Sequence, residues 1–248
     1  MITRAKTFIR LGQSNSRGAA PNSGLDSQYQ GTYDKTLTWT NTSFDAFRNS
    51  TNNQYPTPTN LGGSEFALLK TMQNYYNTTI LDIKYGIGAT SLYVDWNSNT
   101  RGQLFDKSQS VINNALAYAW NILKIRQYDF CLIWDQKEAD TSDQTRAEAY
   151  YDLFTQFHAA FWKNFDCPAF KNSKKYTILH MVNDNQALGA YASTVKTAQE
   201  DLANDIPFVF KNYCESYELQ PDLSHYTCAG YKDMGNYDAN DILIANGF

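Results

Sequence analysis

The chain has 248 residues, of which 42% are hydrophobic and 19% charged, and its formal net charge is −4. This length allows one α/β domain with a full-sized core. Weak acidity without a Lys/Arg run argues against binding to nucleic acid or to an anionic membrane surface. No apolar run approaches the roughly 20 residues of a membrane span. We therefore expect a neutral substrate, or one recognised by local contacts.

The ends and the cysteines of the chain say little about its compartment. Residues 1–10 lack the apolar core of a signal peptide, which fits a cytosolic protein, a virion-associated protein or a secreted protein whose leader has been removed. The four cysteines, at positions 131, 167, 214 and 228, are too sparse for a disulfide framework. Whether Cys214 and Cys228 pair stays open.

Strand-like and helix-like patterns alternate along the chain. Short apolar or β-branched runs predict strands over residues 6–11, 79–85, 128–134, 176–182 and 207–210. The 3.6-residue period predicts helices over 64–72, 111–123, 147–161, 190–203 and 229–243. This alternation predicts a three-layer α/β/α sandwich with a mainly parallel five-stranded sheet in flavodoxin-like order. In such sheets the functional residues lie at the carboxyl ends of the strands.

Residues 18–61 interrupt the alternation. The segment is rich in Asn, Thr, Ser, Gly and Pro, and it carries several aromatic residues. A connection this long is usually functional or disordered, and the aromatics favour an ordered loop insertion within a single domain over 1–248. We expect the loop to fold over the carboxyl edge of the sheet and to offer a sugar-stacking ring, Trp39 first and Tyr33 next. Burial of these rings in the core is the alternative.

Gly12-Gln13-Ser14-Asn15 follows directly after the first predicted strand. A serine at such a glycine-permitted turn can act as a nucleophile, and the backbone N–H groups that follow can face a developing oxyanion. Ser14 is therefore a candidate nucleophile. An ordinary helix cap is the alternative, and Ser16 is a rival nucleophile in the same turn.

A serine nucleophile needs a base and a group that orients the base. The chain has three histidines. His158 falls on the apolar face of a predicted helix and His180 lies inside a predicted strand, so both are interpreted as structural. His225 lies in a polar loop, three residues after Asp222. This spacing predicts that His225 is the base and that Asp222 orients it.

Two further segments follow predicted strands. Residues 86–92 begin with a Gly-Ile-Gly turn, in which a glycine N–H can approach the reacting carbonyl. Residues 135–140 contain Gln136, a candidate side-chain donor, with Glu138 or Asp140 placed to hold it. For Asp140 the alternative is an N-cap of the helix that starts near Asp143.

These blocks, in this order, resemble the SGNH hydrolases. More narrowly, they are similar to the carbohydrate acetylesterase branch that includes sialate O-acetylesterases and plant-type acetylxylan esterases. The matched residues are Gly12 to Asn15, Gly88 to Leu92 with Trp96, Trp134 with Gln136, Glu138 and Asp140, and Asp222 with His225, followed by Gly230 and Tyr231. The match spans nearly the whole chain.

The resemblance implies roles for individual residues. Ser14 would be the nucleophile, His225 the base and Asp222 its orienting group. The backbone N–H groups of Ser14 and Gly88 and the Gln136 side chain would bind the oxyanion. Residues expected to support this machinery are Gln13, Asn15 and Glu138, and residues expected to border the substrate pocket are Trp96, Asp135 and Lys137. No metal and no cofactor are expected, because no Cys/His cluster suggests one.

The chain departs from the family pattern in three places. Ala89 replaces a second glycine, Lys137 replaces a small residue, and Asp135 stands where His is frequent. These changes leave the proposed triad intact and put the substrate preference in doubt.

The predicted activity is that of a serine esterase that removes O-acetyl groups from a carbohydrate through an acetyl-serine intermediate. Its expected partner is the acetylated glycan, with no nucleic acid and no membrane. The sequence leaves open the sugar, the hydroxyl and the oligomeric state. One alternative is an SGNH lipase or thioesterase acting on longer acyl chains. Another is a non-catalytic glycan-binding module of the same fold.

Overall fold

The computed structural model describes residues 3–49, 60–100 and 102–248. All five predicted strands are present: β1 (Thr3–Gly12), β6 (Thr79–Gly86), β7 (Ile125–Asp135), β8 (Lys175–His180) and β9 (Val209–Asn212). They run parallel in the order β6-β1-β7-β8-β9. Counted along the chain, this is the predicted flavodoxin-like order 2-1-3-4-5.

Within the described residues the main sheet has seven strands, so the expected number of five is wrong. The additional strands are β3 (Thr32–Trp39) and β4 (Phe44–Arg48), which extend the sheet beyond β6. β3 runs parallel to β6, and β4 is antiparallel to β3. An irregularity in the β3–β4 pairing between Tyr33 and Leu37 disrupts the alternation of exposed and buried residues. The period-two pattern by which a strand is found in a sequence is therefore missing here.

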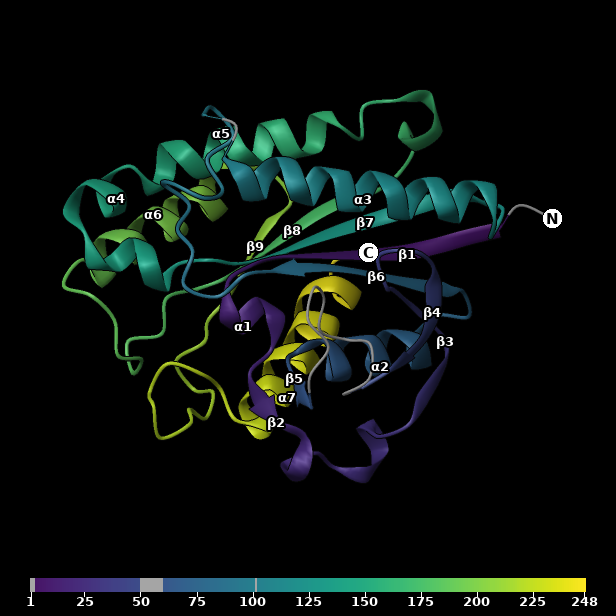
Figure 1. The fold of residues 1–248 in the computed structure, drawn as a ribbon, viewed down its shortest axis with the longest axis horizontal. Coiled ribbons are helices and arrows are strands. Elements are labelled where there is room, and N and C mark those ends of the chain that lie inside the picture. Colours follow the sequence, from purple (N-terminus) through teal and green to yellow (C-terminus); the bar gives the residue numbers. More distant parts are fainter. Residues whose placement is uncertain (1–2, 50–59, 101) are drawn as a thin grey trace.

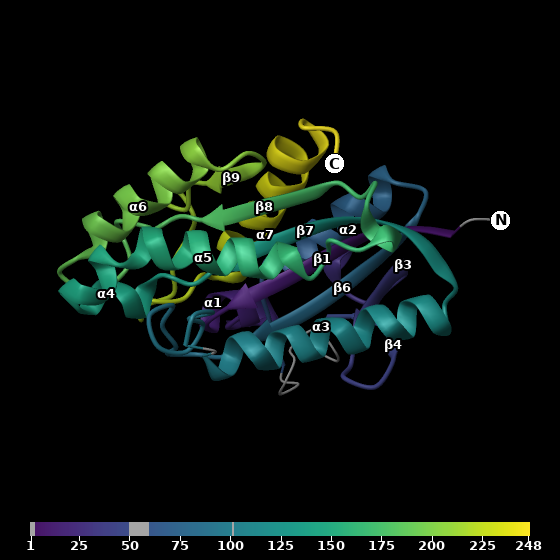
Figure 2. The same ribbon diagram turned by 90° about the horizontal axis from the view of Figure 1, so that it is seen from above.

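Helices cover both faces of the sheet, which confirms the three-layer architecture (Figures 1 and 2). One face carries α2 (Glu65–Tyr75) and α7 (Cys228–Tyr237), which continues as a π-helix over Asp238–Ile244. The other face carries α3 (Gln103–Asn121), α5 (Tyr150–Lys163) and α6 (Ala192–Asp205). The short helices α1 (Ser14–Arg17) and α4 (Gln144–Glu148) lie near the carboxyl ends of the strands.

Strand β7 shows why the sheet is buried on both faces. Phe130, Leu132 and Trp134 pack with the helices α3, α5 and α6, whereas Cys131 and Ile133 pack with α2 and the C-terminal residues. Successive side chains of a strand point to opposite faces. A run of apolar residues in sequence therefore fills two separate cores.

In its described residues, 18–49 and 60–61, the loop insertion forms strands of two sheets and no flap over the active edge. It contributes β3 and β4, together with a small two-stranded sheet of β2 (Ala20–Pro21) and β5 (Leu61–Gly62). Its residues 50–59, including Tyr55, lie outside the described part of the chain. Thr38 of β3 pairs with Asp82, well before β6 ends at Gly86, so this addition lies back from the carboxyl edge.

All four cysteines are free thiols, so Cys214 and Cys228 do not pair. None of the helices in the described ranges is long and apolar enough to cross a membrane.

Candidate active site

Three strands end level with one another at the carboxyl edge of the sheet. Gly12 at the end of β1 pairs with Gly86 of β6 on one side and with Asp135 of β7 on the other. Gly12 has φ +141°, and a Cβ there would lie 2.1 Å from the Asp135 carbonyl oxygen. Only glycine fits this close approach. The loop after β1 is thereby placed against the loops that follow β6 and β7.

Ser14 begins α1 immediately after this turn and is partly exposed. The C-terminal end of the short helix is held by Lys84, whose Nζ donates to the Arg17 carbonyl at 2.8 Å. Neither the Ser14 nor the Gly88 backbone N–H has a protein acceptor among the described residues. Both are therefore available to a ligand. Ser16, the rival nucleophile, is buried.

Gly88 lies directly against Ser14. A Cβ built on Gly88 would be 3.7 Å from the Cβ of Ser14. The next residue, Ala89, has φ +60°, a left-handed conformation that glycine adopts without cost. A glycine would therefore suit this position. Ala89, which stands in its place, adopts a mildly strained backbone conformation.

Asp222 and His225 form a hydrogen-bonded pair within one turn. The His225 Nδ1 lies 2.7 Å from Asp222 Oδ2, and the His225 backbone N–H donates to Asp222 Oδ1 at 3.0 Å. The His225 side chain is 30% exposed and the Asp222 side chain 49% exposed. Partial burial would raise the pKa of Asp222, but the hydrogen bonds from His225 and Ser224 outweigh it and lower the pKa to about 2. An ionised Asp222 thus fixes Nδ1, which leaves Nε2 free to act as a base.

Ser224 joins the histidine loop (residues 222–225) to the nucleophile turn (residues 12–15). The Ser224 carbonyl accepts hydrogen bonds from Asn15 Nδ2 at 3.0 Å and from Gln186 Nε2 at 2.8 Å. Asn15 Oδ1 also accepts from the Tyr231 hydroxyl at 2.7 Å. The hydroxyl of Ser14 and the imidazole of His225 do not hydrogen-bond directly in the structure as described. Such contacts are often longer in unliganded active sites.

Gln136 lies beside the loop that carries Gly88. Its Nε2 donates to the Thr90 carbonyl and to Asp140 Oδ2 at 3.1 Å, and it lies 3.4 Å from Gln13 Oε1. The residue is fully buried. A role as third oxyanion donor would therefore require the amide to exchange one of these acceptors for the substrate.

Asp140 does not cap the following helix, where Asp143 accepts from the Arg146 N–H instead. Asp140 accepts the backbone N–H groups of Leu92 and Tyr93 at 2.9 and 3.2 Å. Burial raises the pKa of Asp140 to about 6 despite these hydrogen bonds. The carboxyl group therefore ties the 86–92 loop to the end of β7.

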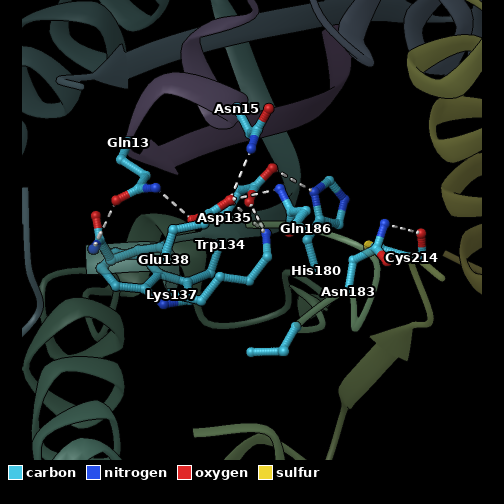
Figure 3. A network of polar contacts seen from close by, with 12 residues as sticks. Gln13, Asn15, Trp134, Asp135, Lys137, Glu138, His180, Asn183, Gln186 and Cys214 are labelled. Carbon is cyan, nitrogen blue, oxygen red and sulfur yellow. Dashed lines mark hydrogen bonds and ion pairs between the residues drawn. The ribbon is translucent and has the colours of Figure 1, made fainter. Parts of the chain in front are cut away.

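Glu138 links the residues on both sides of Ser14. Its Oε2 accepts from Gln13 Nε2, and its Oε1 accepts from Asn15 Nδ2 at 2.7 Å. Figure 3 shows the side chains of Gln13 and Asn15 reaching toward Glu138 from the nucleophile turn. The three residues expected to support the site thus form one hydrogen-bonded group.

Asp135 and Lys137, which we expected to border the substrate pocket, lie in a row of buried charges. Both side chains are buried, and Lys137 Nζ pairs with Asp135 Oδ1. Asp135 Oδ2 lies 3.0 Å from His180 Nδ1, and His180 Nε2 lies 3.0 Å from Asp238 Oδ2. His180, interpreted from the sequence as structural, is buried between these two carboxylates. Burial would lower its pKa, but Asp238 and Asp135 raise it to about 9, so the imidazole is charged near neutral pH.

The aromatic residues expected to contact the sugar are also buried. Trp39 is 3% exposed and packs on Phe44 at a ring distance of 5.3 Å, and Tyr33 packs on Phe47 at 4.9 Å. Trp96 is fully buried and donates its indole N–H to Thr90 Oγ1 at 3.1 Å. The alternative, burial in the core, is correct for Trp39 and Tyr33, because β3 packs these rings beneath the helices.

Gln186 was missed in the sequence. It follows β8 and is 6% exposed. The rule that functional residues follow strand ends would have found it, but no family motif covers this loop.

His158 is half-buried against Thr177 and Trp162, and burial lowers its pKa to about 4, in line with its structural interpretation. Across the described ranges no group of three or more His, Cys, Asp or Glu side chains is arranged to hold a metal ion.

Comparisons with known proteins agree with this geometry. A family model described as "Carbohydrate esterase, sialic acid-specific acetylesterase" matches residues 4–243. No curated protein matches the sequence significantly.

Solved structures share the fold at low sequence identity. A protein from Arabidopsis thaliana superposes with a TM-score of 0.78 at 16% identity, covering 97% of this chain and 98% of its own. NanS gives a TM-score of 0.73 at 11% identity and 99% coverage of both chains. A carbohydrate acetylesterase from Xanthomonas citri gives 0.60 at 10% identity, covering 96% of this chain and 57% of its own.

Proposed function

The chain belongs to the family of carbohydrate esterases described as sialic acid-specific acetylesterases, and we propose that it performs the family's reaction with Ser14 as nucleophile and His225 as base. It is a carboxylic ester hydrolase that removes O-acetyl groups from a carbohydrate. Its substrate is therefore an acetylated glycan. We further propose that the 248 residues act as a single esterase domain, since every proposed catalytic residue lies at one edge of one sheet.

The proposed reaction has two steps. Ser14 Oγ attacks the acetyl carbonyl while His225 Nε2 takes the hydroxyl proton. The resulting oxyanion is held by the Ser14 and Gly88 backbone N–H groups, with Gln136 as a proposed third donor. Collapse breaks the bond to the sugar oxygen, which leaves as an alcohol after receiving the proton from His225. A water molecule then repeats the attack on acetyl-Ser14, and acetate is released.

The observation that carries this proposal is the joint placement of Ser14, Gly88 and the Asp222–His225 pair. Gly88 lies against Ser14, the backbone N–H groups of both have no protein acceptor in the described part of the chain, and Asn15 binds the residue that precedes His225. An acyl-transfer site needs a nucleophile, an oriented base and free donors at one place. These four residues supply all three.

The test is the activity of Ser14→Ala beside the matched variant Ser16→Ala from the same turn. Acetate release is measured from acetylated xylans, sialic acids and bacterial polysaccharides, and p-nitrophenyl acetate is compared with the octanoate. Ser14→Ala should lose about 10⁴- to 10⁶-fold in rate, and Ser16→Ala should keep its activity. Faster octanoate hydrolysis would point to a lipase, and no Ser14-dependent hydrolysis at all would point to a binding module.

A further inference from the structure

The Glu138 carboxylate is the point where the groups around Ser14 and His225 meet. It accepts the side-chain amides of Gln13 and Asn15, which flank Ser14 in the sequence. It also lies 3.4 Å from Gln186 Nε2, the amide that binds the Ser224 carbonyl. A shift of this one carboxylate would therefore move the nucleophile turn and the loop that carries the histidine.

Buried charged side chains lie next to Glu138 (Figure 3). Lys137 Nζ contacts Asp135 Oδ1 and lies 3.5 Å from Glu138 Oε1. Asp135 pairs with His180, and His180 pairs with Asp238. The charges alternate in sign along Asp238, His180, Asp135, Lys137 and Glu138. The Lys137, Asp135, His180 and Asp238 side chains are at most 1% exposed, and that of Glu138 is 14% exposed.

Lys137 is charged in this setting. Burial alone would lower its pKa, but the carboxylates of Asp135 and Glu138 outweigh burial and raise the pKa above its ordinary value. Burial would likewise raise the pKa of Asp135, yet Lys137 and His180 hold it below its ordinary range. Both members of the pair therefore stay ionised.

A buried ion pair does little for stability by itself, because the cost of removing two charges from water offsets their attraction. An apolar side chain of similar volume would fill the position of Lys137 at least as well. What an apolar side chain cannot do is supply a cation beside the Glu138 carboxylate. The contact with Glu138 therefore accounts for a lysine at position 137, whereas packing alone does not.

We propose that Lys137 is a positioning residue of this esterase: fixed by Asp135, its ammonium holds the Glu138 carboxylate in place, aimed at the amides of Gln13 and Asn15. This inference rests on the proposed function of Ser14 and His225. A carboxylate accepts hydrogen bonds at both oxygens, and here Oε2 accepts the Gln13 amide while Oε1 accepts the Asn15 amide. A carboxylate displaced from Lys137 would not meet both amides at once.

The experiment measures kcat and KM for p-nitrophenyl acetate, together with melting temperatures, in the 248-residue chain. Lys137→Met should lower kcat about 10- to 100-fold, the loss typical of a small misplacement of reacting groups, and should change KM by less than about threefold. Glu138→Gln, which keeps the shape without the charge, should give a similar loss. The double variant should be no slower than the slower single variant, because both changes act through one contact.

Lys6→Met is the matched control. Lys6 is also a buried lysine paired with an aspartate, Asp129, but it lies near the amino end of β1. This variant should lose stability and keep its kcat. A similar fall of kcat in Lys6→Met would mean that buried lysines act only through general stability.

An unchanged kcat in Lys137→Met, or losses that simply multiply with those of Glu138→Gln, would overturn the proposal. If Lys137→Met does not fold, the Asp135→Asn/Lys137→Met double variant removes the pair as a unit. It should still show the lowered kcat, and a wild-type kcat would overturn the proposal. If Ser14→Ala, with every other residue unchanged, hydrolyses p-nitrophenyl acetate as fast as the wild type, the proposed function on which this inference rests is overturned instead.

Discussion

Asn15 donates a hydrogen bond of 3.0 Å to the carbonyl oxygen of Ser224, so the residue after the proposed nucleophile holds the residue before the proposed base. The two are 209 positions apart in the chain. Their contact sets the distance between Ser14 and His225 without any direct bond between those two side chains.

Asn15→Ala should lower kcat about 10- to 100-fold, because the histidine loop loses its anchor on the nucleophile turn. The measurement is kcat for p-nitrophenyl acetate. The control is Tyr231→Phe, which removes the hydrogen bond to Asn15 Oδ1 and leaves the donor to Ser224 in place. Equal losses in the two variants would assign the effect to the orientation of Asn15 rather than to the Ser224 contact.

Asp222→Asn should lower kcat by about 10⁴-fold, as expected when the orienting carboxylate of a catalytic histidine is replaced by an amide. The side chain is half-exposed, so the fold should be kept. Since hydrogen bonds hold the pKa of Asp222 at about 2, its charge should persist at every pH at which activity is measured. Less than a tenfold loss, with wild-type melting, would remove Asp222 from the triad.

Gln136→Ala should reduce kcat about 10²- to 10³-fold with little change in KM if the amide stabilises the oxyanion. Because the amide also binds Thr90 and Asp140, a lower melting temperature is expected as well. Asp140→Asn loosens the same loop without removing the amide, so it serves as the control. If the two variants lose kcat equally, Gln136 acts only by stabilising the loop of residues 86–92.

Trp39→Ala should destabilise the protein by about 3–5 kcal/mol, the usual cost of emptying a buried aromatic site. Activity on a polysaccharide and on p-nitrophenyl acetate should fall to the same extent, because the ring packs on Phe44 and Tyr118 and not on substrate. Trp120→Ala, at a tryptophan 36% exposed, is the control for a ring on the surface. A loss confined to the polysaccharide would restore Trp39 as a sugar-binding residue.

His180 should titrate near pH 9: burial lowers its pKa, but Asp238 and Asp135 outweigh burial and raise the pKa above its ordinary value of about 6.5. A histidine whose pKa is raised on folding stabilises the protein fully below pH 6.5, and that contribution is lost as the pH rises through about 9. NMR should show the late titration, with three histidines to assign. The unfolding free energy of the wild type relative to His180→Gln should fall over the same interval. A midpoint below pH 7 would contradict the charged state.

Features that depend on residues close together in the chain could be predicted from the sequence. The five central strands and the helices between them follow from apolar periods of two and 3.6 residues, which each segment carries within itself. The Asp222–His225 pair is equally local, since three residues of one turn bring the carboxylate to the imidazole. The motifs at Gly12–Asn15 and at Gly88 could be placed because parallel strands all end at the same edge.

Features that depend on segments far apart in the chain could be found only in the folded protein. β3 and β4 lack the regular alternation of exposed and buried residues, and they become strands by pairing with β6 and with each other. Trp39 and Trp96 look like surface rings in polar sequence and are buried by elements elsewhere. Lys137 and Asp135 look like pocket residues until His180, 45 positions beyond Asp135, completes their row of charges. Burial and charge pairing depend on which elements pack together, and no local pattern in the chain records that.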